Sequence, residues 1–536
     1  MTINKAIFPV AGLGTLLFGI IEAPEVGWQS TETLVVLGVA VEGLIIRRFF
    51  DAPRVLLTVA TIGLAQLLGF GALILPRAWG ASPSVRSLPE PFGMSIEIGG
   101  TVFDGSDLVA LFVVPLLLIG LVLVLNRTAL GVAIRASADR SSRALTLGIP
   151  VKRLQSLIWT LATVGAFVAL FLTAGTGGLG VGYGTSLGLL LRAIAALVLG
   201  RMTHVGVIVF SSVVLGVLEL AVRFQTGDGA LVAPLLAAII IGALLLRRMG
   251  VTRADRDDTS SWRLASDVRP VPAELARRWE VTAARLGLVS LGVTALAVCP
   301  FVLSTGAMLK LGAVLIIASV GVSLVILSGW AGQLSLGQMA FAGMGGAVFA
   351  WANQTHAVDP ALAICMGAGA GAVAAVVVGL PALRIRGVYL AVTTLALAVA
   401  CSNGVFDNGY FDWIPTGSFA GHRPALLGRI PMDTPAELYL LALGLLVVSL
   451  LAATALRRSR SGRVLIAIRE NEDATRAYGV AVTQAKLAAF AVSGAIAGAA
   501  GAVFTLHQGA FKQALFLPEE SVATFIGVVL GGLASL

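Results

Sequence analysis

The sequence predicts an all-α, polytopic transmembrane protein made of two homologous helical halves. Hydrophobic residues are 57% of the 536-residue chain and charged residues only 12%, about half the charged share of a soluble domain. Apolar runs of about 16 to 22 residues recur along the chain, and about 20 residues are needed to span a bilayer. The 63 glycines fit this class, because small residues let membrane helices approach one another closely.

Apolar stretches predict about eight helices in each half. In the first half they are 8–21, 31–46, 55–75, 108–125, 154–174, 188–203, 205–223 and 231–246. In the second half they are 286–303, 308–328, 338–352, 361–381, 388–404, 438–456, 487–506 and 521–536. The shorter stretches predict broken or half-helices, which are permitted where the backbone lines a cavity inside the protein.

Basic residues gather in loops that fall on one side of the membrane when the helices are threaded in alternation. These loops are 47–54, 131–153, 247–285, 384–386 and 457–486. The positive-inside rule identifies that side as the cytoplasm. The polar stretch 247–285 separates the halves 1–246 and 286–536, and we interpret it as a solvated linker. A regulatory or docking role for it is the alternative.

Two charged segments between apolar helices form a long-period repeat. They are Gly131–Arg153, the first island, and Gly462–Lys486, the second island. In each, a second glycine follows the first after 17 residues, at Gly148 and Gly479, and the two copies are 331 residues apart. An ordinary basic loop is one interpretation. The other is a short amphipathic helix capped by glycine, forming a rigid knob for a partner that is itself a dimer.

A polar, glycine-containing segment interrupts the second half at Ser328–Phe341, with the sequence SGWAGQLSLGQMAF. Polar side chains at membrane depth are costly unless they face a partner or a cavity. A helix broken there would also aim free backbone N–H groups at a substrate carboxylate. Packing between helices by small and polar residues is the equally weighted alternative. The segment is a candidate part of a substrate path.

The sequence indicates no catalytic, cofactor or metal site. It has no Gly-Lys dipeptide and so no phosphate-binding loop of the Walker type. Leu334–Gln338 superficially matches the signature motif of ABC ATPases, but it lies between apolar helices. The four histidines are scattered and the three cysteines isolated, which predicts neither metal ligands nor disulfides. The net charge of +9 comes with arginines in short loops, so it does not indicate a nucleic-acid partner.

These segments carry a resemblance to a known family. The islands resemble the cytoplasmic coupling loops of ABC importer permeases. Residues 286–536, with the polar segment and the second island, are similar to the M-type permease subunit of branched-chain amino acid importers. Residues 42–222, with Glu42, Thr58–Gln66 and Ala195–Leu218, look like the H-type subunit. The chain thus resembles a fusion of both.

The resemblance implies a permease in a bacterial plasma membrane that takes up branched-chain or related hydrophobic amino acids. Two separate ABC ATPase subunits would dock on the islands, and an extracytoplasmic binding protein would deliver the substrate. Related members carry urea or short amides. The implied ATPase-coupling residues are Gly131, Ala136, Asp139, Gly148, Gly462, Ala467, Glu470, Glu472 and Gly479. The implied substrate-path residues are Ser328, Gly329, Gly332, Gln333, Ser335 and Gln338.

The sequence departs from the family pattern in the first island, where Ser141, Ser142 and Arg143 stand opposite Glu472, Asp473 and Ala474. We therefore expect weaker ATPase docking there. A secondary transporter or a passive channel remains an alternative, although ion coupling usually needs ionisable residues inside the membrane. The few candidates are Glu42, Arg192, Arg201 and Glu219. Comparison of the halves also leads us to expect a chain shortened at both ends.

Overall fold

The computed structural model describes residues 63–64, 95–98, 101–139, 141–177, 183–200, 205–227, 229, 231–246, 278–383, 388–406, 413–415, 417–419 and 425–532. The chain divides into two compact units, 1–187 and 188–536, which we describe separately. The helices expected at 8–21, 31–46 and 55–75 lie outside the described residues, apart from 63–64. So does most of the stretch 247–285, although a helix already begins at Trp279.

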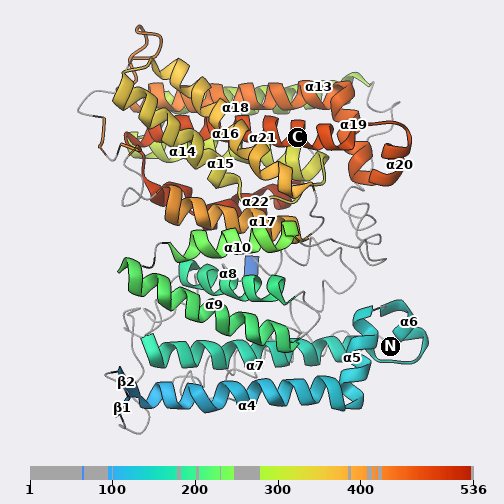
Figure 1. Cartoon of the computed structure of the whole chain (residues 1–536). Coiled ribbons are helices and arrows are strands. Elements are labelled where there is room, and N and C mark those ends of the chain that lie inside the picture. Colours follow the sequence, from blue (N-terminus) through green and yellow to red (C-terminus); the bar gives the residue numbers. More distant parts are fainter. Residues whose placement is uncertain are drawn as a thin grey trace. The chain divides into compact units, whose positions relative to one another are not determined.

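The first unit contains a β-hairpin followed by helices. Strands β1 (Ser95–Ile98) and β2 (Thr101–Asp104) pair antiparallel. The helices are α4 (Gly105–Arg127), α5 (Ala129–Asp139), α6 (Ser141–Thr146) and α7 (Val151–Gly177). In Figure 1, α4 and α7 lie side by side, with α5 and α6 at one end. The hairpin is a small β element in the expected loop 76–107 of an otherwise helical unit.

The second unit is helical throughout its described part, apart from an isolated bridge between Leu426 and Ile430. From 183 to 355 its elements are α8 (Tyr183–Leu199, which begins in the first unit), α9 (Val205–Thr226), α10 (Val232–Leu246), α13 (Trp279–Val302), α14 (Thr305–Leu324), η5 (Val325–Trp330), α15 (Gln338–Ala350) and η6 (Trp351–Thr355). From 360 onward they are α16 (Pro360–Ala382), α17 (Val388–Ala400), η7 (Cys401–Val405), α18 (Pro435–Arg458), α19 (Arg460–Glu470), α20 (Glu472–Ala477), α21 (Val482–Gln508), η8 (Gln513–Phe516) and α22 (Pro518–Gly532).

Eight segments of the described chain are long and apolar enough to cross a membrane. They are Gly105–Arg127, Val151–Thr173, Val205–Thr226, Thr305–Trp330, Pro360–Leu380, Pro435–Arg458, Val482–Gln508 and Gln513–Gly532. Shorter apolar helices lie at Gly188–Leu199, Val232–Leu244 and Leu390–Val405. This confirms the prediction of an all-α, multi-pass membrane protein.

The helix bounds reproduce the repeat seen in the sequence. Helices α5, α6 and α7 begin at 129, 141 and 151, and α19, α20 and α21 begin at 460, 472 and 482. Each pair is 331 residues apart, and so are the ends of these helices. Each island was expected to hold one short helix, and in this respect the prediction was wrong. Each holds the end of an 11-residue helix and then a separate 6-residue helix.

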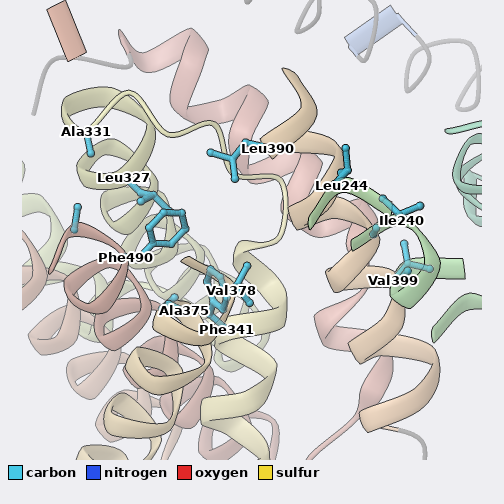
Figure 2. Packing of buried hydrophobic residues seen from close by; sticks show 14 of the residues in the cluster. Ile240, Leu244, Leu327, Ala331, Phe341, Ala375, Val378, Leu390, Val399 and Phe490 are labelled. Atoms are coloured by element: carbon cyan, nitrogen blue, oxygen red, sulfur yellow. The ribbon is translucent and has the colours of Figure 1, made fainter. Parts of the chain in front are cut away.

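The core of the second unit is a close-packed group of α14, α15, α16 and α21 around aromatic and small side chains. Figure 2 shows Phe490 of α21 beside Leu327 of η5, and Phe341 of α15 beside Val378 of α16. Helices α16 and α21 approach so closely that a Cβ atom on Gly371 would lie 2.3 Å from the carbonyl oxygen of Gly494. Small residues thus make this crossing possible, as expected for membrane helices.

Three apolar helices end in a turn of π-helix: α14 in η5, α15 in η6 and α17 in η7. The sequence does not reveal these π-turns, because apolar residues surround them and the hydrophobic period carries little information there. The interruption expected after Ser328 is confirmed, since regular structure stops at Trp330 and resumes at Gln338. Short π-helical turns are frequent at functional sites, and η5 leads directly into the polar segment.

Candidate functional site

The first glycine of each island permits a sharp corner between two helices. A Cβ atom on Gly131 would lie 2.2 Å from the carbonyl oxygen of Leu125, and one on Gly462 would lie 2.2 Å from that of Leu456. A hydroxyl at the corner accepts the glycine N–H in both copies, from Thr128 at 3.1 Å and from Ser459 at 3.2 Å. The two corners are therefore built alike, because a side chain at either glycine would collide with backbone.

The second glycine of each island adopts a left-handed conformation. The φ angles are +80° at Gly148 and +78° at Gly479. No atom would lie within 4 Å of a Cβ added at either position. A side chain would therefore strain the backbone by about 1 kcal/mol or more without causing a collision. The expected cap is confirmed, and each island ends in the same glycine turn.

The tip of each island exposes a large side chain just before the capping glycine. Leu147 is 78% exposed and Tyr478 is 89% exposed. The two residues are 331 positions apart and therefore occupy equivalent places in the repeat. Our sequence reasoning missed them, although an apolar or aromatic residue beside a capping glycine in a charged segment is a usable signal. Each island thus presents a fixed apolar point on a polar surface.

The second island is fastened to α21 by ion pairs. The Glu472 carboxylate lies 2.9 Å from Lys486 Nζ and 2.9 Å from Arg476 Nη2. The Glu472 and Lys486 side chains are only 16% and 7% exposed. The corresponding positions of the first island are Ser141, Leu145 and Gln155. Glu472, which we expected to meet an ATPase, is thus engaged within the island, whereas the side chain of Glu470 is 61% exposed.

Lys486→Met is expected to loosen the second island. Removing one partner of a buried ion pair leaves an uncompensated charge, at a cost of about 3 kcal/mol. We expect faster amide hydrogen exchange over 460–481, measured by mass spectrometry in detergent. The additional change Glu472→Gln should restore most of the protection. Gln155→Met, at the equivalent place in the first unit, should change little, and equal loosening by both single variants would contradict the role of the pair.

The polar segment after η5 is buried. Ser328, Ser335 and Gln338 have no exposed surface, and Gln333 is 8% exposed. The Gln338 side-chain amide donates to the hydroxyls of Ser323 and Ser493, both at 2.7 Å. Hydrogen bonds therefore join the start of α15 to α14 and α21. The candidate substrate-path residues form one polar network inside the second unit.

Hydroxyl groups of neighbouring helices accept N–H groups of this break. The Leu336 N–H donates to Thr394 of α17 at 2.9 Å, and the Met339 N–H donates to Ser521 of α22 at 2.8 Å. Our expectation of N–H groups free for a carboxylate therefore does not hold at these positions. Side chains far away in the sequence supply the acceptors, and single-segment reasoning cannot see them.

The second island and the break are in direct contact. Nη1 of Arg469, in the last turn of α19, donates to the carbonyl oxygen of Gly329 at 2.6 Å. Gly332 has a φ of +68°, and a Cβ atom there would lie 3.0 Å from Cγ of Arg469. The guanidinium of Arg457 also lies 5.8 Å from the centre of the Trp330 ring, within reach of a cation–π contact. The coupling and substrate-path candidates of the second half are thus adjacent.

The environment of Arg469 is unusual for an arginine. Its side chain is only 10% exposed, and burial lowers the pKa of its guanidinium, with the Glu470 carboxylate acting in the opposite direction. The sequence held a signal for this burial. Leu465 and Ile468 face the interior, and Arg469 follows them at helical spacing on the same face.

A duplicated, multi-pass helical protein with a cytoplasmic-type island in each half has the architecture of a membrane transport permease. A family model described as "Branched-chain amino acid transport system / permease component" matches residues 11–247 and 304–536. The chain belongs to this family and carries two permease units in one polypeptide.

The chain is similar to permease proteins of several importers. It is 32% identical over 273 residues to the high-affinity branched-chain amino acid transport system permease protein LivM of Salmonella typhimurium, covering 47% of this chain and 64% of LivM. It is 32% identical over 166 residues to the probable permease LivH of Methanocaldococcus jannaschii, covering 28% of this chain and 50% of LivH.

A third relative is the autoinducer 2 import system permease protein LsrC of an Enterobacter species, 29% identical over 33% of this chain and 49% of LsrC. The chain thus covers less than two thirds of each of these relatives. No solved structure matches the chain.

Proposed function

We propose that this chain is the membrane-spanning permease of an ABC importer in a bacterial plasma membrane, with branched-chain or related hydrophobic amino acids as its substrates. Two islands with the same corner and the same left-handed cap carry this proposal. They are matched surfaces, as a dimeric cytoplasmic motor would need. Residues 1–246 and 286–536 would be the H-type and M-type halves, and 247–285 a cytoplasmic linker.

Two ABC ATPase subunits are the proposed partners of the islands. Exposed apolar and aromatic side chains are the usual anchors of protein interfaces, and Leu147 and Tyr478 stand at the two tips. The exposed Glu470 adds a negative charge beside the second tip for a basic residue of the ATPase. ATP would be hydrolysed on those subunits. The coupling residues then fall into corner, cap and contact residues.

The break at 328–337 is the proposed cytoplasmic end of the substrate path. Its N–H groups at Leu336 and Met339 are bonded to neighbouring hydroxyls, so the described state corresponds to a closed path. Opening would exchange these bonds for contacts with substrate or water. An extracytoplasmic binding protein would deliver the amino acid to the opposite side.

Uptake in a bacterial strain that lacks its own branched-chain importer tests the function. The chain would be expressed with its ATPase and binding-protein partners, and labelled leucine, isoleucine, valine and urea compared. We expect amino acid uptake to exceed urea uptake and to stop when the ATPase cannot hydrolyse ATP. Equal or greater urea uptake would contradict the substrate. Proton- or sodium-driven uptake by the chain alone would indicate a secondary transporter.

A further inference from the structure

We propose that Arg469 is the positioning residue that transmits movement of the second island to the break at 328–337. This inference rests on the proposed function, because it assumes that an ATPase moves the island. It assigns a mechanical connection to one side chain. The connection runs from α19, which leads into the docking surface, to the end of η5, where the substrate path would close.

The guanidinium holds the end of the π-helix. Its Nη1 donates to the carbonyl oxygen of Gly329 at 2.6 Å, one residue before η5 ends. Carbonyl groups at a helix C-terminus carry partial negative charge and lack partners within the helix. A hydrogen bond from a charged donor to such a group is stronger than a neutral one. Burial of the Arg469 side chain to 10% exposure shields this bond from water.

The aliphatic part of Arg469 makes a second contact with the break. It packs against the backbone of Gly332, where a Cβ atom would approach Cγ of Arg469 to 3.0 Å. Because Gly332 also needs its positive φ of +68°, the chain turns at the point that Arg469 covers. The side chain thus touches the break both before and within the turn, and a shift of α19 displaces both points.

The break can respond to such a shift because its hydrogen bonds are made with other helices. Ser328 Oγ accepts the Ser335 N–H at 3.3 Å and donates to the carbonyl oxygen of Gln333 at 3.0 Å. Movement of Gly329 therefore moves Ser328 and the turn that Ser328 closes. The next N–H, at Leu336, is bonded to Thr394 of α17. Displacement by Arg469 thus reaches the contact between the break and α17.

The first island lacks this connection. The residue 331 positions before Arg469 is Ala138, which has no polar side chain. The repeat therefore conserves corner and cap but not the bridging arginine. The bridge distinguishes coupling through the second island from coupling through the first.

The test compares three variants of the assembled transporter in liposomes: Arg469→Met, Arg469→Lys and the control Arg460→Met. Methionine keeps an unbranched stem over Gly332 but removes the donor, and lysine restores a charged donor without the forked geometry. Arg460 is exposed and opens α19 outside the island. For each variant, ATPase co-purification, ATP hydrolysis and substrate transported per ATP would be measured.

We expect Arg469→Met to bind the ATPase and hydrolyse ATP, but to transport about tenfold less substrate per ATP, because a charge-assisted hydrogen bond shifts an equilibrium by about that factor. Arg469→Lys should recover part of the ratio, and Arg460→Met should keep it. In the isolated chain, Arg469→Met should also speed hydrogen exchange over 326–337. An unchanged transport ratio in Arg469→Met, or a loss matched by lost ATPase binding, would overturn the inference. Absence of ATP-driven transport by the unaltered chain would instead refute the proposed function.

Discussion

Gly371→Val is expected to prevent folding of the second unit, whereas Gly369→Val, two residues earlier in α16, is expected to be tolerated. A Cβ atom on Gly371 would lie 2.3 Å from the carbonyl oxygen of Gly494 and 2.7 Å from Cα of Gly498. These are backbone atoms of α21, and they cannot rotate away. Overpacking of this kind costs more than about 3 kcal/mol. No atom lies within 4 Å of the corresponding position on Gly369.

The two variants differ in packing and share everything else that affects a helix. Both place a β-branched residue in α16, so the loss of helix propensity is similar, well under 1 kcal/mol relative to other apolar residues. Expression as a fluorescent fusion, followed by size-exclusion chromatography in detergent, separates folded from aggregated protein. We expect a monodisperse peak for Gly369→Val and none for Gly371→Val. Equal peaks would show that α16 and α21 do not pack in this way.

Much of the fold follows from the sequence because a membrane imposes simple demands. Apolar length determines spans, and the predicted runs 108–125 and 438–456 correspond to α4 (Gly105–Arg127) and α18 (Pro435–Arg458). The 17-residue glycine spacing predicted the shared turn geometry, since only a few backbone arrangements need glycine twice. These properties are local, and one segment is enough to read them.

The contacts across the fold could not be predicted in the same way. Thr394 and Ser521 lie far in the sequence from the N–H groups they accept, at Leu336 and Met339. The expectation of free N–H groups failed for that reason. The inward direction of Glu472 depends on Lys486, whose side chain lies on the buried stripe of α21 with Val482. A lysine at helical spacing within an apolar stripe is a signal for such a partner, and it can be sought in other sequences.

Gly479→Val is expected to abolish transport, and Gly148→Val to reduce it less. Both glycines have the same left-handed conformation, at φ +78° and +80°, and both have free space around a Cβ atom. The cost of folding should therefore be the same for the two variants, about 1 to 2 kcal/mol. A difference in transport then reports how much each island contributes to coupling. The measurement is uptake at equal amounts of inserted protein, together with ATPase co-purification.

Glu470→Lys tests the same assignment without backbone strain. The Glu470 side chain is 61% exposed and its nearest cation, on Arg469, is 4.0 Å away, so the reversal of charge should leave the fold intact. It would place a positive charge where a basic surface of the ATPase is proposed to dock, and like charges at an interface weaken binding and choice of partner. We expect membrane insertion as in the unaltered chain, loss of transport and loose ATPase binding. Normal transport by both second-island variants, or greater damage from Gly148→Val, would show that the first island is the main contact.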